Sequence, residues 1–167
     1  MSILSRLFSR DSTDSLAEGA AVPSVTQINQ DEQAIDLGHI GSDGYLLVYF
    51  YPKADTPGCT KQACSLRDAY AELIDHGVTI LGVSNDKQQS QLAFQQKFDL
   101  PFDLLADTDH VVMDAFGVTK TMGYASRQAF LFKDGTLIWK DLSASTAEQA
   151  ADILNVIASH TLGTNPL

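Results

Sequence analysis

The stretch that decides the fold covers residues 45–70 and reads YLLVYFYPKADTPGCTKQACSLRDAY. Its first seven residues form a continuous apolar run with aromatic and β-branched side chains, which ends at Pro52. A strand buried on both faces of a sheet has this pattern. Residues 60–76 repeat their apolar positions with helical spacing, and residues 78–83 form a second apolar run. These segments predict a βαβ unit with two parallel, neighbouring strands and a right-handed crossover.

The flanking segments extend this unit into a mixed sheet. Asp134-Gly135 is a favoured two-residue hairpin turn, because its positive φ angles match strand twist, and it predicts strands at 128–133 and 136–140. Residues 145–148, Ser-Thr-Ala-Glu, have capping-box spacing and predict the start of the last helix. The other expected elements are a small N-terminal β-hairpin within 22–37, helices at 88–98 and 110–116, and a strand at 102–106. This order predicts an α/β, thioredoxin-like fold with a mixed central sheet flanked by helices.

Length favours one domain with a short extension before it. At roughly 100–200 residues per domain, the 167 residues make a single domain. We predict a flexible tail over residues 1–20 and one thioredoxin-fold domain over residues 21–167. The first ten residues, whose apolar side chains are interrupted by arginines, lack a secretory signal. A weak docking or targeting element remains the alternative for them.

Charge and cysteine content exclude several classes of function. Eleven Lys and Arg residues against 21 Asp and Glu residues give a formal net charge of −10, which disfavours binding to nucleic acid. No apolar run approaches the ~20 residues of a membrane span. Two cysteines are too few for a disulfide framework, so we expect a reducing compartment, the cytoplasm. The four histidines are scattered without metal-ligand spacing, so no metal site is expected.

Cys59 is the strongest candidate for chemistry. It follows the buried strand and a loop, at or just inside the start of the helix that we expect near Thr60. A helix N-terminus carries unpaired N–H groups and about half a positive charge, which stabilise a thiolate. The thiolate is the nucleophilic form of cysteine, so this position favours reactivity. The alternative is a small buried apolar residue, a common role for free cysteine.

Cys64 follows five residues later. On an intact helix this spacing separates the two Cα atoms by about 8.7 Å. A disulfide needs a separation below about 7 Å. The pair is therefore unsuited to a permanent crosslink, and two alternatives stay open. Cys64 is either one half of a redox pair that closes when the first helical turn unwinds, or an inert core residue.

Several of these residues also carry a resemblance to a known family. Pro52, Thr56 and Cys59 match the Pro-x-x-x-Thr-x-x-Cys motif of the peroxiredoxins. The wider string, residues 49–60 with Cys64, Arg67 and Asp68, closely resembles the bacterioferritin comigratory protein or PrxQ subgroup. The resemblance runs from about residue 20 to the C-terminal helix. It implies a thioredoxin-fold thiol peroxidase that reduces hydrogen peroxide and organic hydroperoxides without metal, haem or other cofactor.

The resemblance implies a role for five residues. Cys59 matches the peroxidatic cysteine, which attacks the peroxide and becomes a sulfenic acid. Cys64 matches the resolving cysteine, which closes an intramolecular disulfide. The Thr56 hydroxyl would bond the thiolate and the peroxide, and Pro52 would shape the pocket and shield the sulfur. Arg127 aligns with an arginine that stabilises the thiolate and the transition state; on the residues alone, it also fits a solvated charge at a strand end.

The resemblance has departures, and other functions remain possible on the residues. Gln62 stands where many relatives have Glu, which removes a carboxylate near the thiolate, and Leu66 stands where Phe is common. The resemblance implies a dithiol reductant, thioredoxin, as partner, and it favours a monomer. A disulfide oxidoreductase would normally carry Cys-x-x-Cys rather than four intervening residues. A redox sensor or partner-binding module would use the same oxidation with little turnover.

Overall fold

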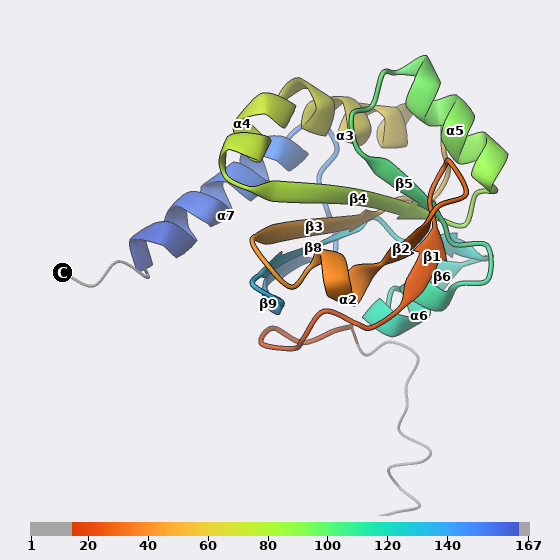
Figure 1. Ribbon diagram of the computed structural model, residues 1–167. Helices are drawn as coiled ribbons and strands as arrows, with labels where there is room; N and C mark the ends of the chain where they lie inside the picture. Colours follow the sequence, from red (N-terminus) through yellow and green to blue (C-terminus); the bar gives the residue numbers. More distant parts are fainter. Residues whose placement is uncertain (1–14, 164–167) are drawn as a thin grey trace, which may run out of the picture.

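A five-stranded mixed sheet organises the computed structural model, which describes residues 15–163 (Figure 1). The strand order is β5-β4-β3-β8-β9. The strands are β3 (Tyr45–Phe50), β4 (Val78–Ser84), β5 (Asp103–Ala106), β8 (Gln128–Lys133) and β9 (Thr136–Asp141). β4 runs parallel to β3 and to β5, whereas β8 runs antiparallel to β3 and to β9. The predicted βαβ unit and mixed sheet are therefore confirmed.

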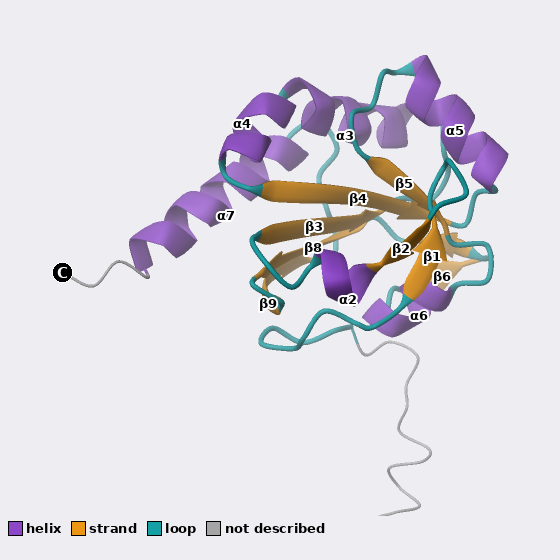
Figure 2. Ribbon diagram, in the orientation of Figure 1, coloured by secondary structure: helices purple, strands orange, loops and turns teal. Residues whose placement is uncertain are grey.

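Helices cover both faces of the sheet (Figure 2). All six residues of β3 are buried, because alternate side chains enter two separate cores. Leu47 and Tyr49 face the first core, and Val48 and Phe50 face the second. The first core lies under α3 (Pro57–Asp68), α4 (Tyr70–Asp75), α5 (Gln88–Lys97) and α7 (Gln149–Gly163), and the second lies against α2 (Leu37–Ile40) and α6 (Val111–Phe116).

The helix after β3 begins earlier than predicted and is divided in two. α3 starts at Pro57 rather than near Thr60, and a break at Ala69 separates it from α4. Proline is favoured at the first helical position because its fixed φ suits the helix and its missing N–H would have no partner there. Cys59 is consequently the third residue of α3, still within the first turn.

The predicted capping box at the last helix is wrong. α7 begins at Gln149, so Ser145 lies four residues before the first helical residue. The Ser145 hydroxyl donates instead to Asp152 Oδ2 at 2.5 Å. The Glu148 backbone carbonyl accepts the N–H of Asp152 at 2.9 Å. A side-chain bond to Asp152 in the first helical turn has replaced the expected reciprocal cap.

The N-terminal hairpin is confirmed and forms a sheet of its own. β1 (Thr26–Ile28) pairs antiparallel with β2 (Ala34–Asp36). Of the predicted tail, residues 1–14 lie outside the described residues, and residues 15–20 lie against the domain. The Leu16 N–H donates to the Phe116 carbonyl at 2.9 Å, and the Gly19 N–H donates to the Leu137 carbonyl at 2.8 Å. The boundary at residue 20 stays a prediction.

Two tight turns shape the region around β8. Asp134 and Gly135 have φ angles of 48° and 85°, as the predicted hairpin between β8 and β9 requires. A further small hairpin, β6 (Lys120–Thr121) with β7 (Tyr124–Ala125), was not expected. Its turn uses Met122 and Gly123, also with positive φ. This hairpin ends immediately before Ser126 and Arg127.

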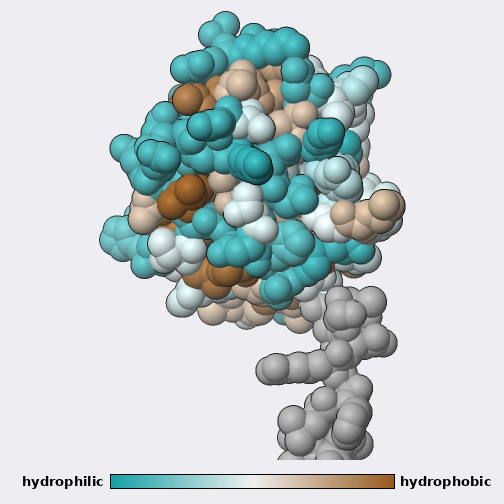
Figure 3. Space-filling view, turned by 90° about the vertical axis from the view of Figure 1, so that its right-hand side faces the viewer, coloured by the Kyte–Doolittle hydropathy of each residue, from teal (hydrophilic) through white to brown (hydrophobic). Residues whose placement is uncertain are grey.

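The described surface is mixed in character. On the side where α5 lies, hydrophilic side chains predominate and hydrophobic ones lie in separate patches (Figure 3). Among residues 15–163, no helix is both long enough and apolar enough to cross a membrane.

Gly82 in β4 is expected to be intolerant of a side chain. A Cβ at this position would lie 2.9 Å from the Tyr49 hydroxyl oxygen and 2.7 Å from Leu104 Cδ2. Gly82→Ala should therefore lower the free energy of unfolding by about 1–3 kcal/mol, as overpacking does, measured by urea denaturation. Gly163→Ala is the control, because a Cβ there meets nothing within 4 Å. Equal unfolding midpoints for the two variants would contradict the tight packing at Gly82.

Candidate active site

Cys59 lies at the carboxyl end of β3, where the chain turns into a helix. The chain leaves β3 at Phe50, crosses a loop, and enters α3 at Pro57. Thr56 takes the N-cap position with extended angles, φ −100° and ψ 158°. The Cys59 side chain is only 1% exposed. The N-terminal N–H groups and partial positive charge of α3 favour an anionic sulfur at this position.

The pairing of β8 with β3 brings Arg127 to the same place. Gln128, the first residue of β8, pairs with Phe50, the last residue of β3, so Arg127 lies beside the end of β3. Its Nη2 donates to Cys59 Sγ at 3.4 Å, although the two residues are 68 positions apart. A Cβ on Gly58 would lie 3.0 Å from Nη2, so the glycine leaves room for the guanidinium. A positive charge and a helix N-terminus therefore converge on one sulfur.

Gln62 fixes the other side of the guanidinium. Arg127 Nη1 donates to Gln62 Oε1 at 2.6 Å. Gln62 lies one turn beyond Cys59 on α3 and is fully buried. Its amide oxygen accepts from the half-buried arginine without adding a negative charge beside the sulfur. Sequence reasoning had noted Gln62 as a departure from many relatives but had given it no contact.

The other two motif residues border the same loop. The Thr56 hydroxyl donates to the Lys53 carbonyl at 2.7 Å, which leaves the lone pairs of its oxygen to accept a hydrogen bond. Pro52 is half-buried and lines a cavity of about 470 Å³ with residues of the β6–β7 hairpin, including Met122 and Tyr124. The structure thus places both residues in the loop before Cys59, and their proposed roles stay predictions.

Asp86 holds this loop and was missed by sequence reasoning. Its Oδ2 accepts from the Ala54 N–H at 2.7 Å and from the Ser84 hydroxyl at 2.6 Å. Asp55, which follows Ala54 in the loop, has a φ of 59° and forms an ion pair with Lys97 of α5 at 2.9 Å. A serine and an aspartate at the end of a strand are typical of turns, where their side chains bond backbone N–H groups. That local signal does not reveal a partner 32 residues away.

Two buried tyrosines flank the site and stay neutral. Burial raises the pKa of the Tyr49 and Tyr51 phenols well above the ordinary value of 10.0. The Tyr51 hydroxyl donates to Gln91 Oε1 at 2.5 Å, and Gln91 Nε2 donates to Ser84 at 2.9 Å. The Tyr49 hydroxyl has no hydrogen-bond partner among the described residues. Neither phenol can act as a base near neutral pH.

Cys64 is the second cysteine on α3. Both cysteines are free thiols; Cys59 is buried and Cys64 is half-buried. Both lie within the helical span Pro57–Asp68. The next residue, Ser65, accepts the Ala150 N–H of α7 through its hydroxyl at 3.1 Å. The structure therefore holds the two sulfurs apart on one intact helix, as the predicted spacing requires of a reduced form.

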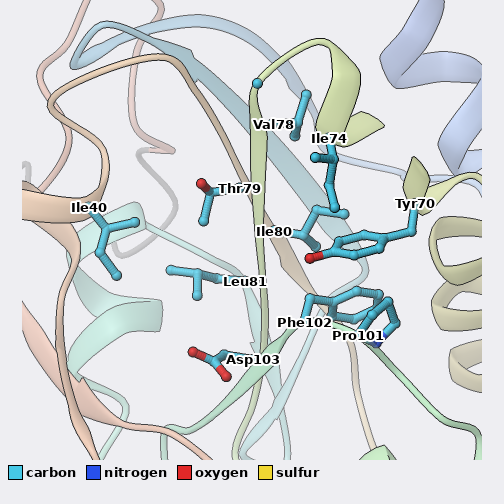
Figure 4. Close-up of a pocket in the computed structure, with 11 residues that line it drawn as sticks. Ile40, Tyr70, Ile74, Val78, Thr79, Ile80, Leu81, Pro101, Phe102 and Asp103 are labelled. Atoms are coloured by element: carbon cyan, nitrogen blue, oxygen red, sulfur yellow. The ribbon is translucent and has the colours of Figure 1, made fainter. Parts of the chain in front are cut away.

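Another cavity lies away from these residues. β5 pairs with β4 only from Leu81 onward, which leaves the first part of β4 with an open edge. A cavity of about 450 Å³ borders this edge, between Tyr70 and Ile74 on one side and Ile40 on the other (Figure 4). It contains none of the predicted site residues. Within residues 15–163, no group of three His, Cys, Asp or Glu side chains could hold a metal ion.

Comparison with known proteins identifies the family. The profile of the AhpC/TSA family matches residues 19–140. The chain belongs to this family. It is 46% identical over 103 residues to peroxiredoxin Bcp of Escherichia coli K12, over 62% of this chain and 65% of that one. A putative peroxiredoxin Bcp of Coxiella burnetii is 40% identical over 104 residues, 62% of this chain and 68% of that one.

A solved structure agrees with these relatives. The bacterioferritin comigratory protein of Xanthomonas campestris superposes with a TM-score of 0.78 and 26% identity, over 88% of this chain and 99% of that one. The predicted resemblance to the Bcp/PrxQ peroxiredoxins, the thioredoxin-like fold and the class of enzyme, a peroxiredoxin, are thus confirmed. The roles of the individual residues in this peroxiredoxin stay predictions.

Removal of the Arg127 charge should slow the reaction of Cys59 with peroxide. We expect Arg127→Met to lower the second-order rate constant for hydrogen peroxide by about 100-fold, as loss of one preorganised donor does. Competition against a peroxidase of known rate measures this constant. Arg67→Met is the matched control, because Arg67 lies on the same helix as Cys59 but bonds Asp68 and the Phe98 carbonyl. A rate constant in Arg127→Met equal to that of the control would exclude Arg127 from the reaction.

Proposed function

We propose that this peroxiredoxin reduces hydrogen peroxide and organic hydroperoxides through Cys59, with Cys64 as the resolving residue and thioredoxin as the reductant. The observation that carries this proposal is the position of Cys59 Sγ, at the N-terminus of α3 and 3.4 Å from Arg127 Nη2. Both features stabilise a thiolate and the charge that develops in its reaction. Thr56, Pro52 and Arg127 complete the proposed site.

In the first step the Cys59 thiolate attacks one oxygen of the peroxide. An S–O bond forms as the O–O bond breaks, and the leaving oxygen takes a proton and departs as water or an alcohol. Cysteine sulfur is thereby oxidised to sulfenic acid. The guanidinium of Arg127 faces the sulfur, so it can stabilise charge as it moves toward the leaving oxygen. The Thr56 oxygen can accept a hydrogen bond from the bound peroxide.

In the second step the Cys64 thiol attacks the sulfenic sulfur of Cys59. A disulfide forms and the sulfenic oxygen leaves as water. The two residues cannot meet while both stay helical, because their Cα atoms would lie about 8.7 Å apart. The first turn of α3 must therefore open. Such a turn has few closed backbone hydrogen bonds, so its local opening free energy is low.

The cavity beside Pro52 supports organic hydroperoxides as substrates. Its walls include Met122, which is 92% exposed, and Tyr124. An alkyl group bonded to the peroxide could lie against these apolar side chains while the O–O group reaches Cys59. The published description of the Xanthomonas campestris relative refers to alkyl peroxide reduction activity. A cavity of about 470 Å³ has room for alkyl groups of different sizes.

Recycling needs two electrons from an external dithiol. A thioredoxin-type protein supplies them by thiol–disulfide exchange, and a reducing compartment such as the cytoplasm would keep it reduced. We propose that the enzyme works there as a monomer. The alternative is a redox sensor, in which the same disulfide would form but would be reduced too slowly for turnover.

A coupled assay separates these two functions. Wild-type protein with thioredoxin, thioredoxin reductase and NADPH should consume many equivalents of peroxide for each protein molecule. Cys59→Ser should consume none in a single turnover. Cys64→Ser should form one equivalent of sulfenic acid, detectable by mass after dimedone labelling, and no intramolecular disulfide. Peroxide consumption by Cys59→Ser at the wild-type rate would refute the assignment, and a wild-type protein that stops after one equivalent would favour the sensor.

Disulfide formation should unwind α3. Amide hydrogen exchange over residues 57–68 should be faster in the oxidised protein than in the reduced one, because the Cys59–Cys64 bond is incompatible with the intact helix. Exchange in β3 should stay unchanged and serves as the internal control. An oxidised protein with the disulfide closed and the reduced level of protection across α3 would contradict this mechanism.

A further inference from the structure

A chain of three side chains, one half-buried and two fully buried, links Cys59 to the start of α7. Arg127 donates to Gln62 Oε1 at 2.6 Å, and Gln62 Nε2 donates in turn to Gln149 Oε1 at 2.6 Å. Gln62 and Gln149 are both fully buried. Gln149 is the first residue of α7 and lies 87 positions from Gln62. The contact therefore joins two helices that the sequence keeps far apart.

The direction of every hydrogen bond in this chain is set by the arginine. A guanidinium only donates, so Gln62 must turn its oxygen toward Arg127. Its NH₂ group then faces Gln149, which must present its own oxygen in reply. The Gln149 Nε2 is thereby left buried, and it has no hydrogen-bond partner among the described residues.

This orphaned donor calls for an explanation, because buried polar groups are nearly always paired. An apolar residue of the same length at position 149 would remove the unpaired NH₂ and would suit the surrounding core. It would also remove the only acceptor that the described structure offers to Gln62 Nε2. The unpaired Nε2 of Gln149 destabilises the fold, but it comes with the Oε1 of the same side chain. That oxygen holds the Gln62 amide in one orientation.

We propose that Gln149 is a positioning residue for the peroxide reaction: by accepting from Gln62 it keeps the Gln62 oxygen on Arg127 and so keeps the guanidinium on Cys59. The inference rests on the proposed function, in which Cys59 attacks the peroxide. Without Gln149, the Gln62 amide loses its acceptor and can rotate. Its NH₂ group would then face the donors of Arg127, and the guanidinium would shift away from the sulfur.

A second contact between the same helices supplies a control. The Ala150 N–H donates to the Ser65 hydroxyl at 3.1 Å and also fastens α7 to α3. This contact does not touch the chain from Cys59 to Gln149. Ser65→Ala therefore loosens the packing of α7 without removing an acceptor from Gln62. A general effect of α7 packing and a specific effect through Gln62 can thus be separated.

The test measures the second-order rate constant of the full-length protein with hydrogen peroxide. Gln149→Met should lower it by about 10-fold, less than the ~100-fold expected for loss of the guanidinium, because Arg127 is displaced but keeps its charge, whereas Ser65→Ala should stay near the wild-type value. Gln149→Glu keeps an oxygen for Gln62 and should recover most of the loss. In a Gln62→Met background, Gln149→Met should cause no further loss, because its effect passes through Gln62. Thermal melting verifies folding, and Gln149→Leu replaces Gln149→Met if that variant does not fold.

The outcomes separate a failure of the role of Gln149 from a failure of the proposed peroxidase function. If wild-type protein does not react and Cys59→Ser behaves identically, the proposed function fails. If wild-type protein reacts and Gln149→Met matches it, only the role of Gln149 is overturned. Three other outcomes would also overturn the role of Gln149. The first is an equal loss of rate in Ser65→Ala and Gln149→Met, and the second is no recovery of the rate in Gln149→Glu. The third is a loss from Gln149→Met that is as large in the Gln62→Met background as in the wild type.

Discussion

The register between β3 and β8 is the constraint on which the site depends. Because Gln128 pairs with Phe50, Arg127 meets the chain where it leaves β3 toward Cys59. A slip of one residue would turn every side chain of β8 to the opposite face of the sheet. Phe130 and Phe132 prevent this slip, since both pack into the core against α6. The packing of aromatic rings on one face of the sheet thus fixes the contact between Arg127 and Cys59 at the carboxyl end of β3.

The charge balance around the sulfur follows from the same geometry. Arg127 needs an acceptor for its second donor, and a carboxylate there would offset part of the positive field on Cys59. Gln62 accepts that hydrogen bond as a neutral amide, so the guanidinium charge acts mainly on the sulfur. The neutral amide has a disadvantage that a carboxylate lacks, because its buried NH₂ group also needs a hydrogen-bond acceptor. That donor is the reason that the network continues to Gln149 and ends there unpaired.

The limits of sequence-based prediction here have a physical pattern. The strands were predictable because continuous apolar runs and Asp134-Gly135 are local signals. Cys59 was predictable from its place at a helix start, but the start itself was set too late because Pro57 and Gly58 are typical of loops. Arg127 stood out only through the resemblance, since its contact depends on pairing across 68 positions. Asp86 has only the local signal of a turn and Gln149 has none, because tertiary packing alone brings their partners to them.

The proposed mechanism makes α3 satisfy two opposed demands. The peroxide step needs the first turn intact, whereas the disulfide needs it open. Arg127 and the helix N-terminus hold the turn most strongly when Cys59 is a thiolate, because the negative sulfur is attracted both to the guanidinium and to the partial positive charge of the helix. Oxidation to sulfenic acid removes that charge and weakens both contacts. The first chemical step therefore loosens the turn whose opening the second step requires.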